Sequence, residues 1–169
     1  MNNEGYNYDI SIVGGGPNGL FALYKLSKTF PGKKIILIEK GEILNNLRKL
    51  PDVLWHSKMS ELKLPSYLNS QIDNDLTPTT SQLIDYYIHY SSEHELNTME
   101  NHEVIDIVKQ DNDHYYKISM LNNNVEKSLK SKVILLCTGI YENKIKLNIN
   151  TNFNYVKYEI NLNHQNKKL

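Results

Sequence analysis

The chain lacks most of the features that mark secreted, membrane-spanning or nucleic-acid-binding proteins. Its single cysteine, Cys137, excludes an internal disulfide and a Cys-x-x-Cys redox pair. No apolar run approaches the roughly twenty residues that a membrane span requires, and the polar, acidic start does not resemble a signal peptide. Nineteen basic residues balance nineteen acidic ones without forming a basic stripe. We therefore expect a cytoplasmic protein whose partners include neither nucleic acid nor a membrane.

Glycine is also scarce, yet four of the eight glycines fall within one stretch of ten residues, "SIVGGGPNGL". The residues before it, Asp9–Val13, alternate like a short strand, and apolar residues recur at helical spacing from Pro17 to Thr29. After the turn "PGK", the continuously apolar run Lys34–Glu39 is typical of a strand covered on both faces. Residues 9–39 therefore predict a β-α-β unit with two parallel strands.

The glycine spacing within this unit predicts a site for a dinucleotide. Gly14-x-Gly16-x-x-Gly19 lies between strand and helix, and Glu39 ends the second strand twenty residues later. Gly14 permits a tight turn, Gly16 lets a diphosphate approach the backbone, and Gly19 lets the helix pack closely on the strand. Pro17 suits the first helical turn, where free N–H groups face the phosphates.

The acid at the end of the second strand bears on the choice of dinucleotide. The Glu39 carboxylate can accept hydrogen bonds from both ribose hydroxyls, and its charge repels a 2′-phosphate, which disfavours NADP at this site. The competing interpretation is a glycine-rich turn with a solvated acid. The residues by themselves do not decide whether the dinucleotide is FAD or NAD.

The rest of the chain predicts an irregular segment, one helix and a set of strands. Residues 41–77 are expected to be irregular with at most short helices, and Thr79 or Thr80 to cap a helix that runs to about His94. An antiparallel meander follows, with strands at Glu103–Lys109, Tyr115–Leu121 and Val125–Leu129. A final buried strand is expected at Lys132–Cys137. The fold class is therefore α/β, with a Rossmann-like parallel sheet and a three-stranded antiparallel meander.

Three segments resemble one family of flavoproteins. "DISIVGGGPNGLFALYKL" with "KKIILIEKG" resembles the FAD-binding start of the two-dinucleotide-domain flavoproteins, which include thioredoxin reductases, flavin-containing monooxygenases and bacillithiol disulfide reductases. "PTTSQLIDYYIHYSSEHEL" is similar to the helix before their meander. "KVILLCTGIYENK" is similar to their second flavin motif, a strand that ends in Ala-Thr-Gly, with Cys137 in place of the alanine.

The resemblance implies a set of cofactor-binding residues. It adds a backbone contact to adenine at Val104 and flavin contacts in the irregular segment, where Trp55, His56 and Ser57 are candidates. The whole predicted set is Gly14, Gly15, Gly16, Pro17, Asn18, Gly19, Glu39, Lys40, Trp55, Val104, Thr138 and Gly139. No catalytic residue is assigned and no metal site is expected.

The resemblance also implies what an intact relative does. Such a protein transfers a hydride from NAD(P)H to FAD and passes the electrons to a disulfide or to oxygen. After Gly139 this sequence contains no further glycine, so it holds no second fingerprint for a nicotinamide cofactor. We expect residues 1–147 to form an incomplete FAD-binding domain and 148–169 to resemble an inter-domain linker. Three interpretations stay open. The chain is part of an oxidoreductase, truncated or completed by a second polypeptide; or it is a flavin- or nucleotide-binding module without turnover; or it is a Rossmann-like domain that binds NAD or only adenosine.

Overall fold

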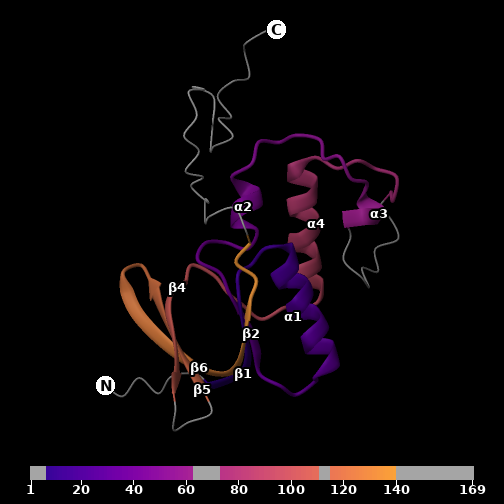
Figure 1. Cartoon of the computed structure of the whole chain (residues 1–169). Coiled ribbons are helices and arrows are strands. Elements are labelled where there is room, and N and C mark those ends of the chain that lie inside the picture. Colours follow the sequence, from indigo (N-terminus) through magenta and orange to yellow (C-terminus); the bar gives the residue numbers. More distant parts are fainter. Residues whose placement is uncertain (1–6, 63–72, 111–114, 140–169) are drawn as a thin grey trace, which may run out of the picture. The chain divides into compact units, whose positions relative to one another are not determined.

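The computed structural model describes residues 7–62, 73–110 and 115–139 (Figure 1). The chain divides into two compact units, Met1–Thr138 and Gly139–Leu169. The elements of the described residues lie in the first unit. They are the helices α1 (Pro17–Thr29), α2 (Asn45–Arg48), α3 (Met59–Leu62) and α4 (Thr80–Glu93) and the strands β1 (Asn7–Val13), β2 (Ile35–Ile38), β3 (Thr98–Met99), β4 (Glu103–Gln110), β5 (Tyr115–Asn122) and β6 (Val125–Leu136). The predicted domain boundary between residues 147 and 148 lies outside the described residues.

One six-stranded mixed sheet organises the first unit, in the order β3-β2-β1-β6-β5-β4. The strands β3, β2, β1 and β6 are parallel, and β6, β5 and β4 form an antiparallel meander. This confirms the predicted fold class, α/β with a parallel sheet and a meander. The two-residue strand β3, which pairs with the end of β2, was not predicted.

The prediction of a separate last strand was wrong. Val125–Leu129 and residues 132–136 belong to one continuous strand, β6, and Cys137 follows its last residue, Leu136. Its first part pairs with β5 as far as Ser131, and its second part pairs with β1 from Lys130 onward. Because one strand serves both neighbours, β6 joins the meander to the parallel strands without a turn.

The end of β6 is also not buried, which corrects a second prediction. Val133 and Leu136 are 52% and 63% exposed. Beyond Ser131, β6 pairs with β1 on one side and, among the described residues, with no strand on the other. An apolar run predicts burial only if some element covers it.

Two apolar clusters lie on opposite faces of the parallel strands. The helix-side cluster joins β1 and β2 to α1 and α4 through Ile12, Leu20, Leu23, Ile35, Leu37, Leu83 and Tyr90. The meander-side cluster joins Ile36 and Ile38 of β2 to Ile118, Met120 and Leu129. The four residues of β2 are all buried because they alternate between these clusters, as its unbroken apolar sequence predicts. Figure 1 shows α1 and α4 together beside the parallel strands.

Both long helices begin where local sequence signals place them. Helix α1 has the predicted bounds, with Pro17 in its first turn. Thr79 caps α4 in a capping box, in which its side chain accepts from the Gln82 N–H and the Gln82 side chain accepts from the Thr79 N–H. The helices pack together through aromatic rings, with the Tyr24 and Tyr90 centroids 5.4 Å apart in an edge-to-face arrangement. None of the described helices is long and apolar enough to cross a bilayer.

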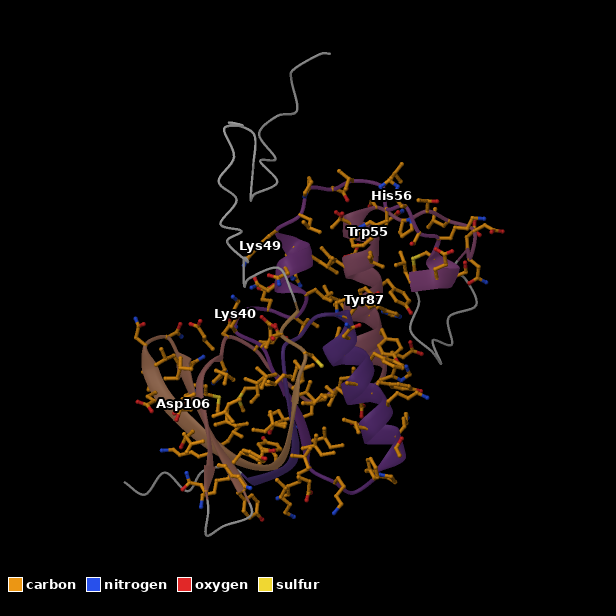
Figure 2. All side chains as sticks on the ribbon, viewed as in Figure 1. Lys40, Lys49, Trp55, His56, Tyr87 and Asp106 are labelled. Atoms are coloured by element: carbon orange, nitrogen blue, oxygen red, sulfur yellow. The ribbon has the colours of Figure 1, made fainter. Side chains whose placement is uncertain are left out.

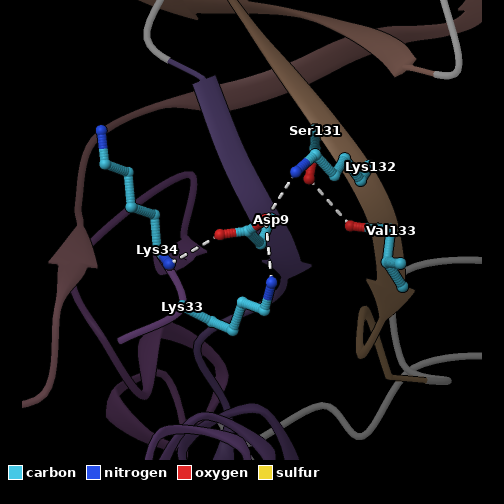
Figure 3. Close-up of polar contacts among 6 residues, drawn as sticks. All are labelled: Asp9, Lys33, Lys34, Ser131, Lys132 and Val133. Carbon is cyan, nitrogen blue, oxygen red and sulfur yellow. Dashed lines mark hydrogen bonds and ion pairs between the residues drawn. The ribbon is translucent and has the colours of Figure 1, made fainter. Parts of the chain in front are cut away.

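Charged side chains connect the amino end of β1 to its two neighbouring strands, β2 and β6 (Figure 3). The Asp9 carboxylate accepts from the Lys34 backbone N–H at 3.0 Å and from Lys132 Nζ at 2.8 Å, with Lys33 Nζ 3.8 Å away. The side-chain hydrogen bond from Lys132 and the backbone bond from Lys34 lower the pKa of Asp9. The half-buried Asp9 lies at the end of β1 opposite to the glycine loop.

Candidate functional site

The loop between β1 and α1 is folded so tightly that three of its glycines leave no room for a side chain, and a Cβ on Gly15 would lie 2.9 Å from Glu39 Cβ. Gly14 has φ of +111°, and a Cβ there would overlap the carbonyl oxygen of Cys137 at the end of β6. A Cβ on Gly19 would overlap the carbonyl oxygen of Gly14. The missing side chains thus let β1, α1 and β6 meet at one point. These are the turn and the close packing that the spacing predicts for Gly14 and Gly19.

Gly16 differs because its side-chain direction is open. Among the described residues, no heavy atom lies within 4 Å of a Cβ built on Gly16. Gly16 is the N-cap of α1, where no side chain caps the helix. The first N–H groups of the helix and its partial positive charge therefore face a space that an anion can enter. Together these features form an open cradle of unhindered backbone at Gly16 and the start of α1.

The Glu39 carboxylate is held against this cradle by backbone hydrogen bonds. Glu39 is 8% exposed, and its Oε2 accepts from the Gly15 N–H at 2.6 Å. Its other oxygen, Oε1, accepts from the Gly41 N–H at 3.1 Å. A carboxylate offers about four acceptor positions, so about two stay available for the hydroxyls of a ribose. Glu39 is thus buried beside the glycine loop rather than solvated.

The end of β6 lies against the other side of the loop. The Cys137 N–H donates to the Val13 carbonyl at 2.7 Å, which continues the pairing of β6 with β1. Burial raises the pKa of the Cys137 thiol, as expected for a packing residue rather than a reactive thiolate. Thr138 is exposed. Gly139 has φ of +73°, in the left-handed region that favours glycine.

The structure brings some of the predicted residues together and leaves others apart. Pro17 and Asn18 open α1 beside the cradle, and Lys40 follows Glu39 as an exposed residue. Figure 2 shows Lys40 apart from Trp55 and His56. The Trp55 indole N–H donates to Thr80 Oγ1 at 3.2 Å at the start of α4, and the ring packs on the helix-side cluster.

The predicted contacts of Trp55, His56, Ser57 and Val104 with the cofactor stay predictions. The half-buried Val104 pairs with Met120 and packs on the meander-side cluster. His56 is exposed and Ser57 is half-buried.

Sequence reasoning missed the turn at residues 41–44, which follows β2 and contains Leu44. The Gly41 N–H orients Glu39, and the Leu44 N–H donates to the Gly15 carbonyl at 2.9 Å. Glu100, from the turn after β3, accepts from the Ile43 N–H at 3.1 Å. Gly41, two residues after Glu39, was a usable signal, whereas nothing in the sequence connects Glu100 with residues 57 positions earlier.

Comparisons with known proteins agree with this geometry. A family model described as pyridine nucleotide-disulphide oxidoreductase matches residues 11–168. The bacillithiol disulfide reductase of Bacillus cereus has a similar fold, with a TM-score of 0.75 at 23% identity, over 85% of this chain and 43% of that one. A flavin-containing monooxygenase of Stenotrophomonas maltophilia is similar with a TM-score of 0.69 at 14% identity, over 83% of this chain and 41% of that one.

A short match to a viral protein adds no function. An uncharacterized protein of Acanthamoeba polyphaga mimivirus is 47% identical over 36 residues, which cover 21% of this chain and 7% of that protein. All three of these relatives are much longer, and this chain spans less than half the length of each.

Proposed function

We propose a function from the premise that this chain belongs to the pyridine nucleotide-disulphide oxidoreductase family. The chain binds FAD as the amino-terminal flavin-binding part of an NAD(P)H-dependent oxidoreductase. The observation that carries the proposal is the pairing of an open phosphate cradle at Gly16 with a pre-oriented carboxylate at Glu39. The cradle suits the diphosphate of FAD, and the carboxylate suits its adenosine ribose. We also expect this protein to act in the cytoplasm.

The chain's own residues would bind and orient the cofactor. Backbone N–H groups at the start of α1 would hold the diphosphate, and Glu39 would hold the ribose and disfavour a 2′-phosphate. A bound flavin supplies the chemistry of taking a hydride from a nicotinamide and passing electrons to an acceptor. No residue of this chain is assigned to that chemistry.

Binding of FAD by the purified chain tests the proposal. We expect the chain to show flavin absorbance or to quench the fluorescence of added FAD. Glu39→Ala should weaken FAD binding about tenfold or more, because it removes the charged acceptors of the ribose. Gly16→Val should weaken it further by filling the cradle. Glu126→Ala, at an exposed residue of β6 outside the site, serves as the matched control.

The melting temperature with each added ligand distinguishes FAD from NAD as the cofactor. A ligand that binds the folded state raises the melting temperature. We expect FAD to raise it more than NAD does. A chain that ignores FAD but is stabilised by NAD would contradict the flavin proposal and support a module for NAD.

We further propose that a second polypeptide carrying the NAD(P)H domain completes the enzyme. The apolar end of β6 is exposed at Val133 and Leu136, with one sheet edge unpaired among the described residues. An exposed apolar strand edge is a ready surface for another chain. The FAD-loaded chain by itself should therefore stay oxidised when NADH or NADPH is added without oxygen, and bleaching would contradict this second proposal.

A further inference from the structure

The turn after β2 contains a residue in a costly conformation. Leu44 has φ of +64°, in the left-handed region, although it is a bulky residue and fully buried. Such a conformation is unfavourable for a residue other than glycine, because its Cβ crowds the following carbonyl oxygen. It persists only where the surroundings hold it in place.

Three hydrogen bonds hold this turn, two of them with residues far away in the sequence. The Ile43 N–H donates to Glu100 Oε2 at 3.1 Å, and the Ile43 carbonyl accepts from Arg48 Nε at 3.0 Å. The Leu44 N–H donates to the Gly15 carbonyl at 2.9 Å. The bond to Glu100 has a charged acceptor and is therefore one of the stronger types.

The turn also orients the Glu39 carboxylate, which is proposed to bind the ribose. Its first residue, Gly41, donates its N–H to Glu39 Oε1 at 3.1 Å. The Gly41 carbonyl accepts from the Asn101 N–H at 2.8 Å, next to Glu100 in the chain. A shift of the turn away from Glu100 would therefore withdraw one of the two N–H groups that orient Glu39.

We propose that Glu100 is a positioning residue for the dinucleotide site: by accepting the Ile43 N–H it holds the Leu44 turn and thereby keeps the Gly41 N–H on the Glu39 carboxylate. The proposal rests on the proposed function, because it assigns the effect on ligand binding to the ribose of FAD. Glu100 does not itself contact the cofactor. Its effect on binding passes through Glu39.

A double-mutant cycle in the full chain tests the proposal. We expect Glu100→Ala to weaken FAD binding about fivefold to tenfold, which is within the usual coupling of residues in one network. Glu100→Gln keeps an oxygen that can accept the Ile43 N–H and should bind FAD within about threefold of the wild type. The double variant of Glu39→Ala and Glu100→Ala should bind no more weakly than Glu39→Ala. Glu126→Ala, at an exposed residue of β6, is the matched control.

Amide hydrogen exchange in the ligand-free chain gives a readout that does not depend on FAD. We expect the Gly41 amide to exchange faster in Glu100→Ala than in the wild type, while the amides of β2 keep their protection. If Glu100→Ala fails to fold, Glu100→Asp replaces it, because Asp keeps the charge but has a shorter reach.

The outcomes separate this proposal from the proposed function. Additive losses of FAD affinity in the double variant, or a Glu100→Ala variant that equals the Glu126→Ala control, would overturn the role of Glu100. If the wild type binds no FAD, the proposed function fails. The exchange of Gly41 then decides whether Glu100 positions the turn, and an unchanged rate overturns that role.

Discussion

Replacing single glycines of the β1–α1 loop by alanine should separate its structural positions from its ligand-facing one. In Gly19→Ala the new methyl group would overlap the Gly14 carbonyl oxygen and lie 3.2 Å from Leu37 Cδ1. Overpacking costs about 1–3 kcal/mol, and the upper end applies here because the overlapped atom is a backbone oxygen that cannot rotate away. Alanine recovers about 1 kcal/mol through its higher helix propensity. We therefore expect the free energy of unfolding to fall by about 2 kcal/mol.

Gly16→Ala is the matched comparison because its methyl group would project into open space. Gly16 has φ of −76° and ψ of −179°, which alanine adopts without strain. Losing a glycine N-cap costs at most about 1 kcal/mol. The free energy of unfolding should therefore fall less than in Gly19→Ala, whereas FAD affinity should fall because the methyl group enters the cradle.

Urea unfolding followed by far-ultraviolet circular dichroism measures both free energies, provided that the slope of the transition stays constant. For a chain of this length, about 1 kcal/mol corresponds to a shift of about 2–4 °C in Tm. A Gly19→Ala variant as stable as the wild type, or a Gly16→Ala variant less stable than Gly19→Ala, would refute the packing geometry.

Three further substitutions test other parts of the fold. Ser11→Ala should raise the free energy of unfolding by about 1 kcal/mol, because Ser11 Oγ is buried without a hydrogen-bond partner among the described residues. A urea midpoint below that of the wild type would contradict this and would indicate that Ser11 Oγ has a partner such as a bound water. Asp9→Asn should reduce the loss of stability in acid: the pKa of Asp9 is lowered in the folded state, so its contribution is present above pH 3.8 and is lost as the pH falls below it. Equal differences between the urea midpoints at pH 7 and pH 2 in variant and wild type would contradict this. Tyr87→Phe should lose about 1 kcal/mol at pH 7 with the bond from its hydroxyl to the Leu62 carbonyl. The variant should also lose less stability than the wild type between pH 10 and 12 in urea unfolding, because burial raises the pKa of Tyr87 to about 12 and favours the neutral hydroxyl in the folded state.

Local signals predicted the cradle and much of the fold around it. Helix α1 has the bounds that its proline and apolar spacing predict, and Thr79 caps α4 as its sequence indicates. The place of Glu39 at the end of β2 follows from the apolar run before it. Each of these features depends on residues close together in the sequence.

Pairings between distant segments could not be predicted in the same way. The sequence gives no reason to join Val125–Leu129 with Lys132–Cys137 into one strand, because that continuity depends on β5 and β1 pairing with its two halves. The two-residue strand β3 exists only because β2 offers it a partner. The exposure of Val133 and Leu136 depends on which elements cover them.

The sequence by itself determined a glycine loop between β1 and α1 and an acid at the end of β2, because φ preference, helix capping and strand periodicity act over a few residues. Only the tertiary structure decided how that acid is held. The Gly15 and Gly41 N–H groups orient Glu39, and Glu100 reaches Ile43 across 57 residues. Hydrogen bonds between such distant groups form only after the sheet has brought β2 and β3 side by side.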